Sequence, residues 1–361
     1  MSRSVCVIIP SVGNADELGI VLDGLQSQDY FGPLEVVVVG PINDSGRKQA
    51  ESRGIRFIDD QGCRTRADAC NIALAATESE LVMFTDDDVI VPEEWVSRLS
   101  RWFEQSEVAG VGGPNFGPPD HSTLQQQVID VSFCSRIFTT GTNYGNIGES
   151  ELEEVDQLPG VNSAYRRSVL EQVGNFPEGS IGAEDVLLDH SIRSSGHRLW
   201  TDRTAIMWHR RRNLTRVRKQ ISNYGLVRTL VSNQHSELRS WSHVMVALFP
   251  PIVIAAFAAF YWGSNNGGFA TPWWDFSLNA LELSFERIGV LALPWLIILY
   301  NVIAWYGSAV GNSPNRSLAT VFLSPIVIFT LHWSYGIGVL RGWWRIFTGN
   351  PGMQIDDRTR A

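Results

Sequence analysis

Two groups of acidic residues in this chain have types and spacing suited to chemistry. Asp86, Asp87 and Asp88 follow directly on a short apolar run, and Glu184 and Asp185 precede the apolar positions of a predicted helix. Three adjacent carboxylates repel one another, and a hard divalent cation such as Mg²⁺ or Mn²⁺ removes that repulsion while also binding phosphate oxygens. A carboxylate at a helix N-terminus is held in its charged form by the helix dipole and suits a general base.

Both groups also have an interpretation without chemistry. The three aspartates would then form a solvated acidic turn in which Asp88 caps the next helix, and Glu184 and Asp185 would cap their own helix. The choice between these interpretations depends on the elements that position the two groups.

The first half of the chain alternates between short apolar strands and amphipathic helices. This rhythm indicates an α/β class with a mainly parallel sheet and helices on both faces. Ligands bind such sheets at the carboxyl ends of the strands, which is where the three aspartates lie. The predicted strands are 4–9, 35–39, 55–58 and 81–85, and the predicted helices are 15–28, 65–76 and 92–105.

Three stretches after residue 240 lack charge, at about 244–262, 288–308 and 317–340. Each reaches the roughly 20 residues that a helix needs to cross a bilayer, and tryptophans gather near their ends. Pro250 and Pro251 suggest that the first stretch is kinked or re-entrant. The expected organisation is a catalytic domain at 1–239, a transmembrane region of about three helices at 240–345, and a polar tail at 346–361.

The charges that flank these stretches predict a multi-pass protein of the cell membrane with a cytoplasmic catalytic domain. The basic segment 210–219 precedes the first stretch, whereas the connector 263–287 carries mostly acidic charges. Positive charge favours the cytoplasmic side. Three spans would place the tail outside, where Arg341 and Arg345 are unfavourable, so two and four spans remain alternatives.

The overall composition excludes one class of partner. The net charge of −9 argues against nucleic-acid binding, which requires a basic surface. The four cysteines form no CxxC pair and no zinc-site spacing, so reduced thiols are expected.

The order of these motifs resembles the family 2 inverting glycosyltransferases with the GT-A fold. The segments 160–167 and 174–176 lead to Glu184-Asp185 as in that family, and His209 with the three following arginines is similar to its closing basic segment. The resemblance covers about residues 4–230 and is closest to membrane-anchored members of lipid-linked oligosaccharide or surface-glycan assembly. It implies inverting, metal-dependent transfer of a single sugar from a UDP- or GDP-linked donor to a polyprenyl-phosphate-linked glycan.

The resemblance also assigns roles to residues. Asp185 corresponds to the catalytic base, with Glu184 contacting the acceptor or orienting the loop. Asp86 and Asp88 correspond to ligands of Mg²⁺ or Mn²⁺, and His209 is either a further ligand or a buried histidine beside Trp208. The expected nucleotide-sugar residues are Pro10, Ser11, Asp44, Arg66, Asn71, Asp86, Asp87, Arg210, Arg211 and Arg212, the three arginines being alternatively sites for a lipid phosphate or anionic membrane lipid.

Two departures from the family pattern leave the nucleobase open. The second strand ends in Gly40-Pro41, where acidic residues are usual, and Asp44 follows three residues later. Members of the family usually have an arginine directly before the position of Asn71, where this chain has Cys70. Arg64 or Arg66 would have to supply the missing positive charge.

Two other functions would also place a protein of this kind at a membrane. A processive polysaccharide synthase usually carries a QxxRW-like motif and more spans, whereas this chain has only Gln220, Tyr224 and Arg228 in the corresponding region. A catalytically inactive membrane scaffold would have no need for the intact aspartates and Asp185.

Overall fold

The computed structural model describes residues 2–138, 151–266 and 285–350. The amino-terminal part is an α/β domain whose eight-stranded sheet has the order β3-β2-β1-β4-β9-β6-β10-β8. A smaller sheet of β5, β11 and β7 lies beside it. The strands are β1 Val5–Pro10, β2 Leu34–Gly40, β3 Arg56–Asp59, β4 Leu81–Phe84, β5 Val89–Ile90, β6 Val108–Gly112, β7 Asn115–Phe116, β8 Leu152–Val155, β9 Ser163–Arg166, β10 Arg198–Asp202 and β11 Met207–His209.

The predicted α/β class with a mainly parallel sheet is confirmed. Strands β3, β2, β1 and β4 run parallel, and β9 inserts antiparallel between β4 and β6. The helices of this domain are α1 Ala15–Gln26, α2 Ser45–Ser52, α3 Arg66–Ala75, α4 Trp95–Ser100, α5 Leu124–Phe133, α6 Arg167–Val173 and α7 Glu184–Ser194. The helix predicted at 92–105 is shorter than expected, because a 3₁₀ turn continues α4 at Arg101–Glu104.

Alternation along the strands divides the core into two layers. In β1, Val5, Val7 and Ile9 belong to the cluster that includes α1 and α4, while Cys6 and Ile8 belong to the cluster that includes α3 and α6. Successive side chains of a strand point to opposite faces, so a fully apolar strand requires helices on both sides. All four cysteines are free, as expected.

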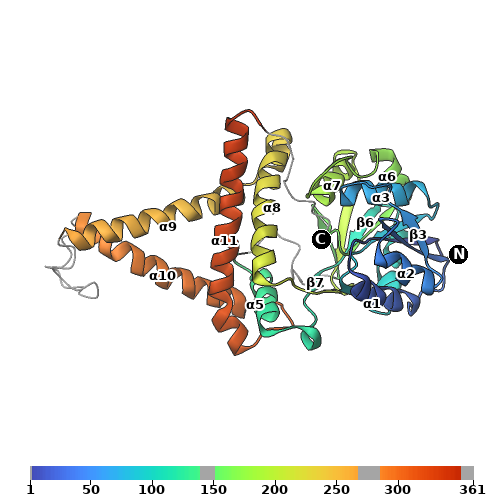
Figure 1. Cartoon of the computed structure of the whole chain (residues 1–361), viewed down its shortest axis with the longest axis horizontal. Coiled ribbons are helices and arrows are strands. Elements are labelled where there is room, and N and C mark those ends of the chain that lie inside the picture. Colours follow the sequence, from blue (N-terminus) through green and yellow to red (C-terminus); the bar gives the residue numbers. More distant parts are fainter. Residues whose placement is uncertain (1, 139–150, 267–284, 351–361) are drawn as a thin grey trace.

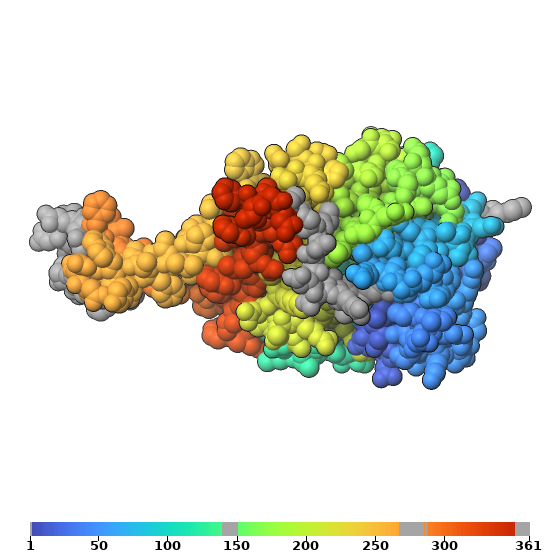
Figure 2. All heavy atoms as spheres, turned by 45° about the horizontal axis from the view of Figure 1, so that its top comes forward, coloured from blue at the N-terminus to red at the C-terminus, as the bar shows by residue number. Residues whose placement is uncertain are grey.

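The carboxyl-terminal helices form two differently oriented groups (Figure 1). Helices α9 (Trp241–Asn265) and α10 (Phe285–Ala309) pack side by side and extend away from the α/β domain as a hairpin. Helices α8 (Leu214–Gln234) and α11 (Leu318–Phe347) lie side by side across the base of that hairpin. The space-filling view shows the hairpin as a narrow arm that projects from the rest of the molecule (Figure 2).

Within the described residues, three helices are long and apolar enough to cross a membrane: α9, α10 from Arg287, and α11. They correspond to the three uncharged stretches of the sequence. Helix α9 continues through Pro250 and Pro251, so that stretch is not re-entrant. Helix α11 continues past residue 340 to Phe347, and the tail beyond residue 350 lies outside the described residues.

Candidate active site

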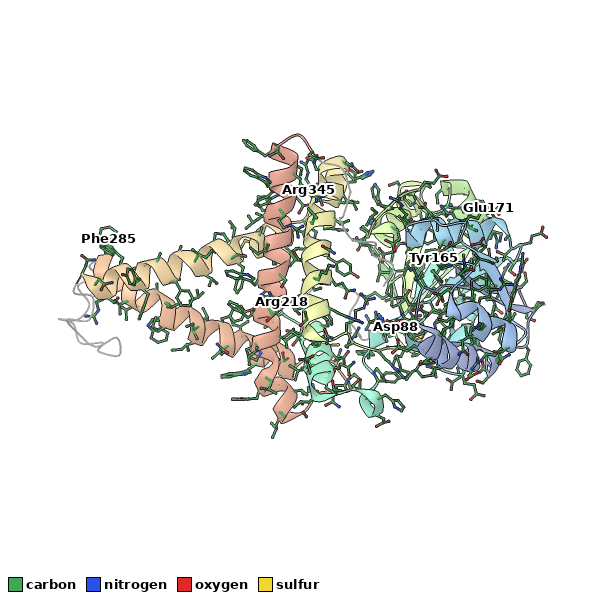
Figure 3. All side chains as sticks on the ribbon, viewed as in Figure 1. Asp88, Tyr165, Glu171, Arg218, Phe285 and Arg345 are labelled. Carbon is green, nitrogen blue, oxygen red and sulfur yellow. The ribbon has the colours of Figure 1, made fainter. Side chains whose placement is uncertain are left out.

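Several of the predicted site residues lie together at the carboxyl end of the parallel strands. Asp86 to Asp88 follow β4, Ser11 follows β1, and Asp44 follows β2, which pairs with β1. Because parallel strands end at one edge of the sheet, residues up to 77 positions apart in the chain meet there. Figure 3 marks this edge with Asp88, on the side of the domain that faces α8.

Arg66 connects the two acidic groups. Its guanidinium donates to Oδ1 of Asp86 at 3.2 and 3.3 Å and to the carbonyl of Gly160 at 2.7 Å. It also lies 3.8 Å from Oε1 of Glu184. The pKa of Arg66 is raised, because the attraction of Asp86 and Glu184 outweighs the effect of burial. Of the two arginines near Cys70, Arg66 thus has its charge beside both acidic groups, whereas Arg64 is exposed.

Asp88 faces the small sheet. Its Oδ1 lies 3.1 Å from Nε2 of His209, which is on β11 and pairs with Val89 directly after Asp88. Burial raises the pKa of Asp88, but the facing imidazole outweighs burial and holds the pKa below its usual value. The structure therefore brings His209 to the aspartates and not merely beside Trp208.

Asp87 turns away from its two neighbours. Its Oδ1 accepts a hydrogen bond of 3.0 Å from the side-chain amide of Asn14, in the loop after β1. Burial raises the pKa of Asp87 to about 6, although the Asn14 amide opposes this shift. Asn14 was not among the predicted site residues, and its position in the first loop is the signal that would have included it.

Glu184 and Asp185 begin α7, as predicted. Oδ1 of Asp185 accepts a 2.8 Å hydrogen bond from the backbone of Val186. Burial raises the pKa of both carboxyls, and their mutual repulsion adds to this for Glu184. The preceding Ala183 has φ of 59°, a left-handed conformation that costs free energy in a residue with a side chain. The chain turns at this residue into α7, which begins with the two carboxylates.

Gly40 explains one departure from the family pattern. A Cβ atom at this position would lie 2.3 Å from the carbonyl oxygen of Ser11, so no side chain fits. The carboxylate of Asp44 instead reaches the first loop, where it accepts a 2.8 Å hydrogen bond from the backbone of Gly13. Asp44 also caps α2 through Gly46 at 2.7 Å. Asp44 thus brings an acidic side chain to the first loop from a position four residues after the end of β2.

Two predicted nucleotide-sugar residues have contacts outside the aspartate cluster. Both ends of the Asn71 amide bond the backbone of Phe176, at 2.9 and 3.1 Å, and so tie α3 to the segment before α7. Arg210 forms an ion pair of 3.2 Å with Glu17 of α1. Arg212 is partly exposed and contributes to the low pKa of Asp88 by its charge, so it remains close to the aspartates.

Arg211 lies in a different place. Its guanidinium is buried and donates to Oδ1 of Asp130 at 2.8 Å and to Asn115 at 2.9 Å. Asp130 also accepts from the backbone of Gly117 at 2.6 Å and from Ser313, between α10 and α11, at 2.6 Å. This buried cluster, which sequence reasoning missed, joins the α/β domain to the carboxyl-terminal helices.

The cluster of Asp86, Asp88 and His209 has ligand atoms suited to a divalent cation. One carboxylate oxygen each from Asp86 and Asp88 and a ring nitrogen of His209 lie within 4.8 Å of one another. Two carboxylates suit hard cations such as Mg²⁺ and Mn²⁺, which leave coordination positions for phosphate oxygens. The residues present therefore fit a metal that also holds a diphosphate.

Comparison with known proteins agrees with this geometry. The chain has the GT-A fold: it is similar to the mannosyltransferase PcManGT from Pyrobaculum calidifontis, with a TM-score of 0.52 and 18% identity, over 95% of this chain and 88% of that one. Residues 6–174 match Glycosyl transferase family 2. The chain therefore carries a family 2 glycosyltransferase domain.

Curated relatives share the sequence at low identity. The O-antigen chain rhamnosyltransferase RfbN of Salmonella typhimurium is 23% identical over 57% of this chain, and the succinoglycan biosynthesis protein ExoA of Rhizobium meliloti is 23% identical over 72%. The chain spans 66% of RfbN and 44% of an N-acetylglucosaminyltransferase of Azorhizobium caulinodans, less than two thirds of either, and 79% of ExoA.

Proposed function

We propose that this protein transfers a single sugar, with inversion, from a nucleotide sugar to a lipid-linked glycan at the membrane surface. The observation that carries the proposal is the connection of Asp86 to Glu184 through Arg66, because it brings the diphosphate side and the base side of a transfer site together. The names of RfbN and ExoA, which refer to O-antigen and succinoglycan, support a surface glycan as the acceptor.

The chemistry follows from the positions of the carboxylates. Asp185 removes the proton of the acceptor hydroxyl as that oxygen bonds to the anomeric carbon of the donor sugar. The bond from the anomeric carbon to the diphosphate oxygen breaks in the same step, and the nucleoside diphosphate leaves with the electron pair. Attack from the face opposite the leaving group inverts the anomeric centre, so no covalent sugar–enzyme intermediate is needed.

The remaining residues hold and orient the donor. Asp86, Asp88 and His209 would bind a divalent cation, which supplies neutralisation of the charge that develops on the diphosphate. Arg66 orients Asp86 and stays charged throughout, because its pKa is raised. Pro10, Ser11 and Asp44 border the region for the nucleoside, and Asn71 holds the backbone that leads to α7.

The experiment that tests the proposal combines the detergent-purified full chain with nucleotide sugars and polyprenyl-linked acceptors. We expect one donor to be consumed and one sugar to be added, with the anomeric configuration inverted in the product. Consumption that lengthens the product by many units would instead support a processive synthase. A protein that consumes no donor from a complete panel, with Mg²⁺ and Mn²⁺ present, would contradict the proposal.

The metal site gives a separate prediction. Transfer should stop with excess EDTA and return with Mn²⁺ or Mg²⁺. Replacing His209 with Gln should raise the Mn²⁺ concentration for half-maximal transfer by about 10- to 100-fold, the range that loss of supporting groups produces at metal sites. A matched control is His197→Gln, because His197 is remote from the aspartates and contacts Gln172. If His209→Gln had an unchanged Mn²⁺ requirement, His209 would not be a metal ligand and its role would be the contact with Asp88.

The helix arrangement supports two membrane spans, α9 and α10, with α11 lying along the membrane surface. At 3.6 residues per turn, the exposed large apolar residues of α11 fall on one face: Leu318, Phe322, Ile326, Phe329, Trp343, Trp344 and Phe347. Other parts of its surface pack on α8 and α5, and α11 also contacts α9 and α10 at the base of the hairpin. One apolar face is the pattern of an interfacial helix, whereas a span exposes apolar residues all round.

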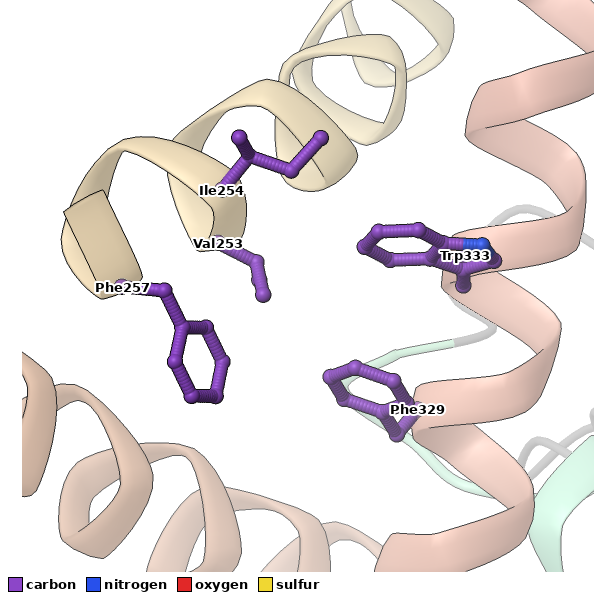
Figure 4. Close-up of a pocket in the computed structure, with 5 residues that line it drawn as sticks. All are labelled: Val253, Ile254, Phe257, Phe329 and Trp333. Carbon is purple, nitrogen blue, oxygen red and sulfur yellow. The ribbon is translucent and has the colours of Figure 1, made fainter.

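Helix α8 strengthens this inference, since Arg216, Arg218 and Lys219 are exposed on it and it runs beside α11. An apolar hollow of about 430 Å³ opens between α9 and α11 (Figure 4), lined by Val253, Ile254, Phe257, Phe329 and Trp333. Such a surface suits lipid chains at the base of the hairpin. Two spans also return Arg341 and Arg345 to the basic, cytoplasmic side.

A labelling experiment decides between two and three spans. Single cysteines replace Glu104 in the α/β domain, Asn266 at the far end of the hairpin and Asn350 after α11, all exposed positions. With two spans, a membrane-impermeant maleimide added to intact cells should label Asn266→Cys above the parent protein and leave the other two at background. Labelling of Asn350→Cys together with Asn266→Cys would support three spans.

A further inference from the structure

A groove between α8 and α11 lies outside the candidate active site. It has a volume of about 480 Å³ and follows both helices, from residue 215 to 226 on α8 and from 334 to 345 on α11. At about 1.5 Å per residue this is roughly 16 Å. Its lining residues are Thr215, Arg218, Lys219, Ser222, Asn223, Leu226, Ser334, Ile337, Arg341 and Arg345.

The charge of the groove has one sign. Two basic residues line it from each helix, Arg218 and Lys219 on α8 and Arg341 and Arg345 on α11. The sequences of α8 and α11 contain no aspartate or glutamate. Hydroxyl and amide groups of four further lining residues add hydrogen-bond donors. Several donors and cations around one space match an anion with many oxygens, such as a phosphate or diphosphate.

One end of the groove joins an apolar hollow. This second space, of about 380 Å³, shares Ile337, Arg341 and Arg345 with the groove and adds Leu340 and Trp344. Trp344 is 67% exposed. A basic site that continues into an exposed apolar surface matches a molecule with a phosphate at one end and a hydrocarbon chain at the other.

Close helix packing fixes the width of the groove. A Cβ atom on Gly338 of α11 would lie 2.0 Å from the carbonyl oxygen of Ser222, and one on Gly225 of α8 would lie 2.3 Å from that of Tyr335. The two backbones therefore approach as closely as glycine allows. Figure 3 labels Arg218 on α8 and Arg345 on α11, the helices that form the two walls.

We propose that this groove binds the phosphate group of a membrane lipid, whose chain lies over Leu340 and Trp344. The identification of that lipid as the carrier of the glycan acceptor rests on the proposed function. Helix α8 connects the two sites: Val227, one residue after the lining residue Leu226, packs against Leu187 of α7, the helix that begins with Glu184 and Asp185. A lipid phosphate in the groove would thus lie on the helix that packs beside the base.

Direct binding tests the proposal without reference to transfer. Purified full chain in detergent, with EDTA present, is titrated with undecaprenyl diphosphate, undecaprenol or inorganic diphosphate, and bound ligand is counted by native mass spectrometry. We expect the lipid diphosphate to bind well and the alcohol and the free anion to bind weakly. The double replacement Arg341→Gln with Arg345→Gln should weaken binding on the order of tenfold or more, because each arginine contact to a charged group is lost.

The matched control is Arg216→Gln, since Arg216 is an exposed cation of α8 that does not line the groove. It should bind the lipid diphosphate like the wild type. Nucleotide-sugar affinity, measured with Mn²⁺, should be unchanged in all variants, which shows that they are folded. Equal lipid binding in the wild type and the double variant, or equal affinity for the free anion, would overturn the proposal. Failure to find any transfer reaction would count against the proposed function and leave this result intact.

Discussion

Replacing Asp185 with Asn should lower kcat/KM for sugar transfer by about 10²- to 10⁴-fold, the contribution typical of a general base. The amide has nearly the shape of the carboxylate but does not accept the acceptor proton. The hydrogen bond from the backbone of Val186 to Oδ1 can persist in the variant, so α7 should still begin at the same place. Single-turnover transfer with saturating donor measures the effect, and the affinity for the nucleotide sugar should remain near the wild-type value.

The pH dependence separates a base from a merely structural carboxylate. A base works only when deprotonated, and burial raises the pKa of Asp185 and of Glu184 beside it. The acidic limb of kcat/KM should therefore lie above the ordinary range of about 4 for a carboxyl group, with activity lost as the pH falls through it. Glu184→Gln removes one negative charge from the pair and should shift this limb to lower pH. Wild-type transfer by Asp185→Asn would contradict the assigned role.

Replacing Asp130 with Ala should destabilise the protein by about 3–5 kcal/mol, because it leaves the buried guanidinium of Arg211 without its carboxylate. Both side chains are almost fully buried, with 3% of Arg211 and 0% of Asp130 exposed. Asp130 also accepts hydrogen bonds from Gly117 and Ser313, which lose their partner as well. The melting temperature of the detergent-purified full chain measures the loss.

The same cluster tests the role of Arg211. The double replacement of Asp130 with Leu and Arg211 with Met removes both charges and should recover part of the stability lost in the single variant. Arg210→Gln is the matched control and should hardly change the melting temperature, because its ion pair with Glu17 is partly exposed. If Arg211→Met retained full stability and lost only nucleotide-sugar affinity, Arg211 would act in donor binding as the sequence suggested.

Much of the α/β domain could be predicted from local pattern. The apolar runs that became β1, β2 and β4 are buried on both faces. A continuous apolar run is typical of a strand that is covered on both faces, so the sequence alone predicts both the strand and its burial. The antiparallel insertion of β9 between β4 and β6 could not be predicted, because strand pairing depends on contacts between residues far apart in the chain. Helix α8 was also missed, since its cations interrupt the apolar periodicity.

The surroundings of the three consecutive arginines likewise depend on tertiary packing. Arg210, Arg211 and Arg212 are adjacent in the sequence and were treated alike, yet Arg211 points into the interior while Arg212 acts near Asp88. Neighbouring side chains point in different directions, and only the elements packed around the segment determine which groups they contact. The sequence offers both Arg64 and Arg66, and the packing of α3 on β1, the strand that pairs with β4, brings Arg66 to Asp86.

The sequence by itself determined where the acidic groups stand in the chain and the apolar character of three long helices. Charge and hydrophobicity are properties of consecutive residues. They can therefore be recognised in the sequence alone for the triple aspartate, for the carboxylate pair at a helix start and for the long uncharged stretches. The tertiary structure decided that Arg66 joins the two acidic groups, that His209 faces Asp88, and that α11 packs along α8 across the base of the α9–α10 hairpin. These depend on which surfaces pack together, and a linear pattern of apolar residues does not specify the partner that covers them.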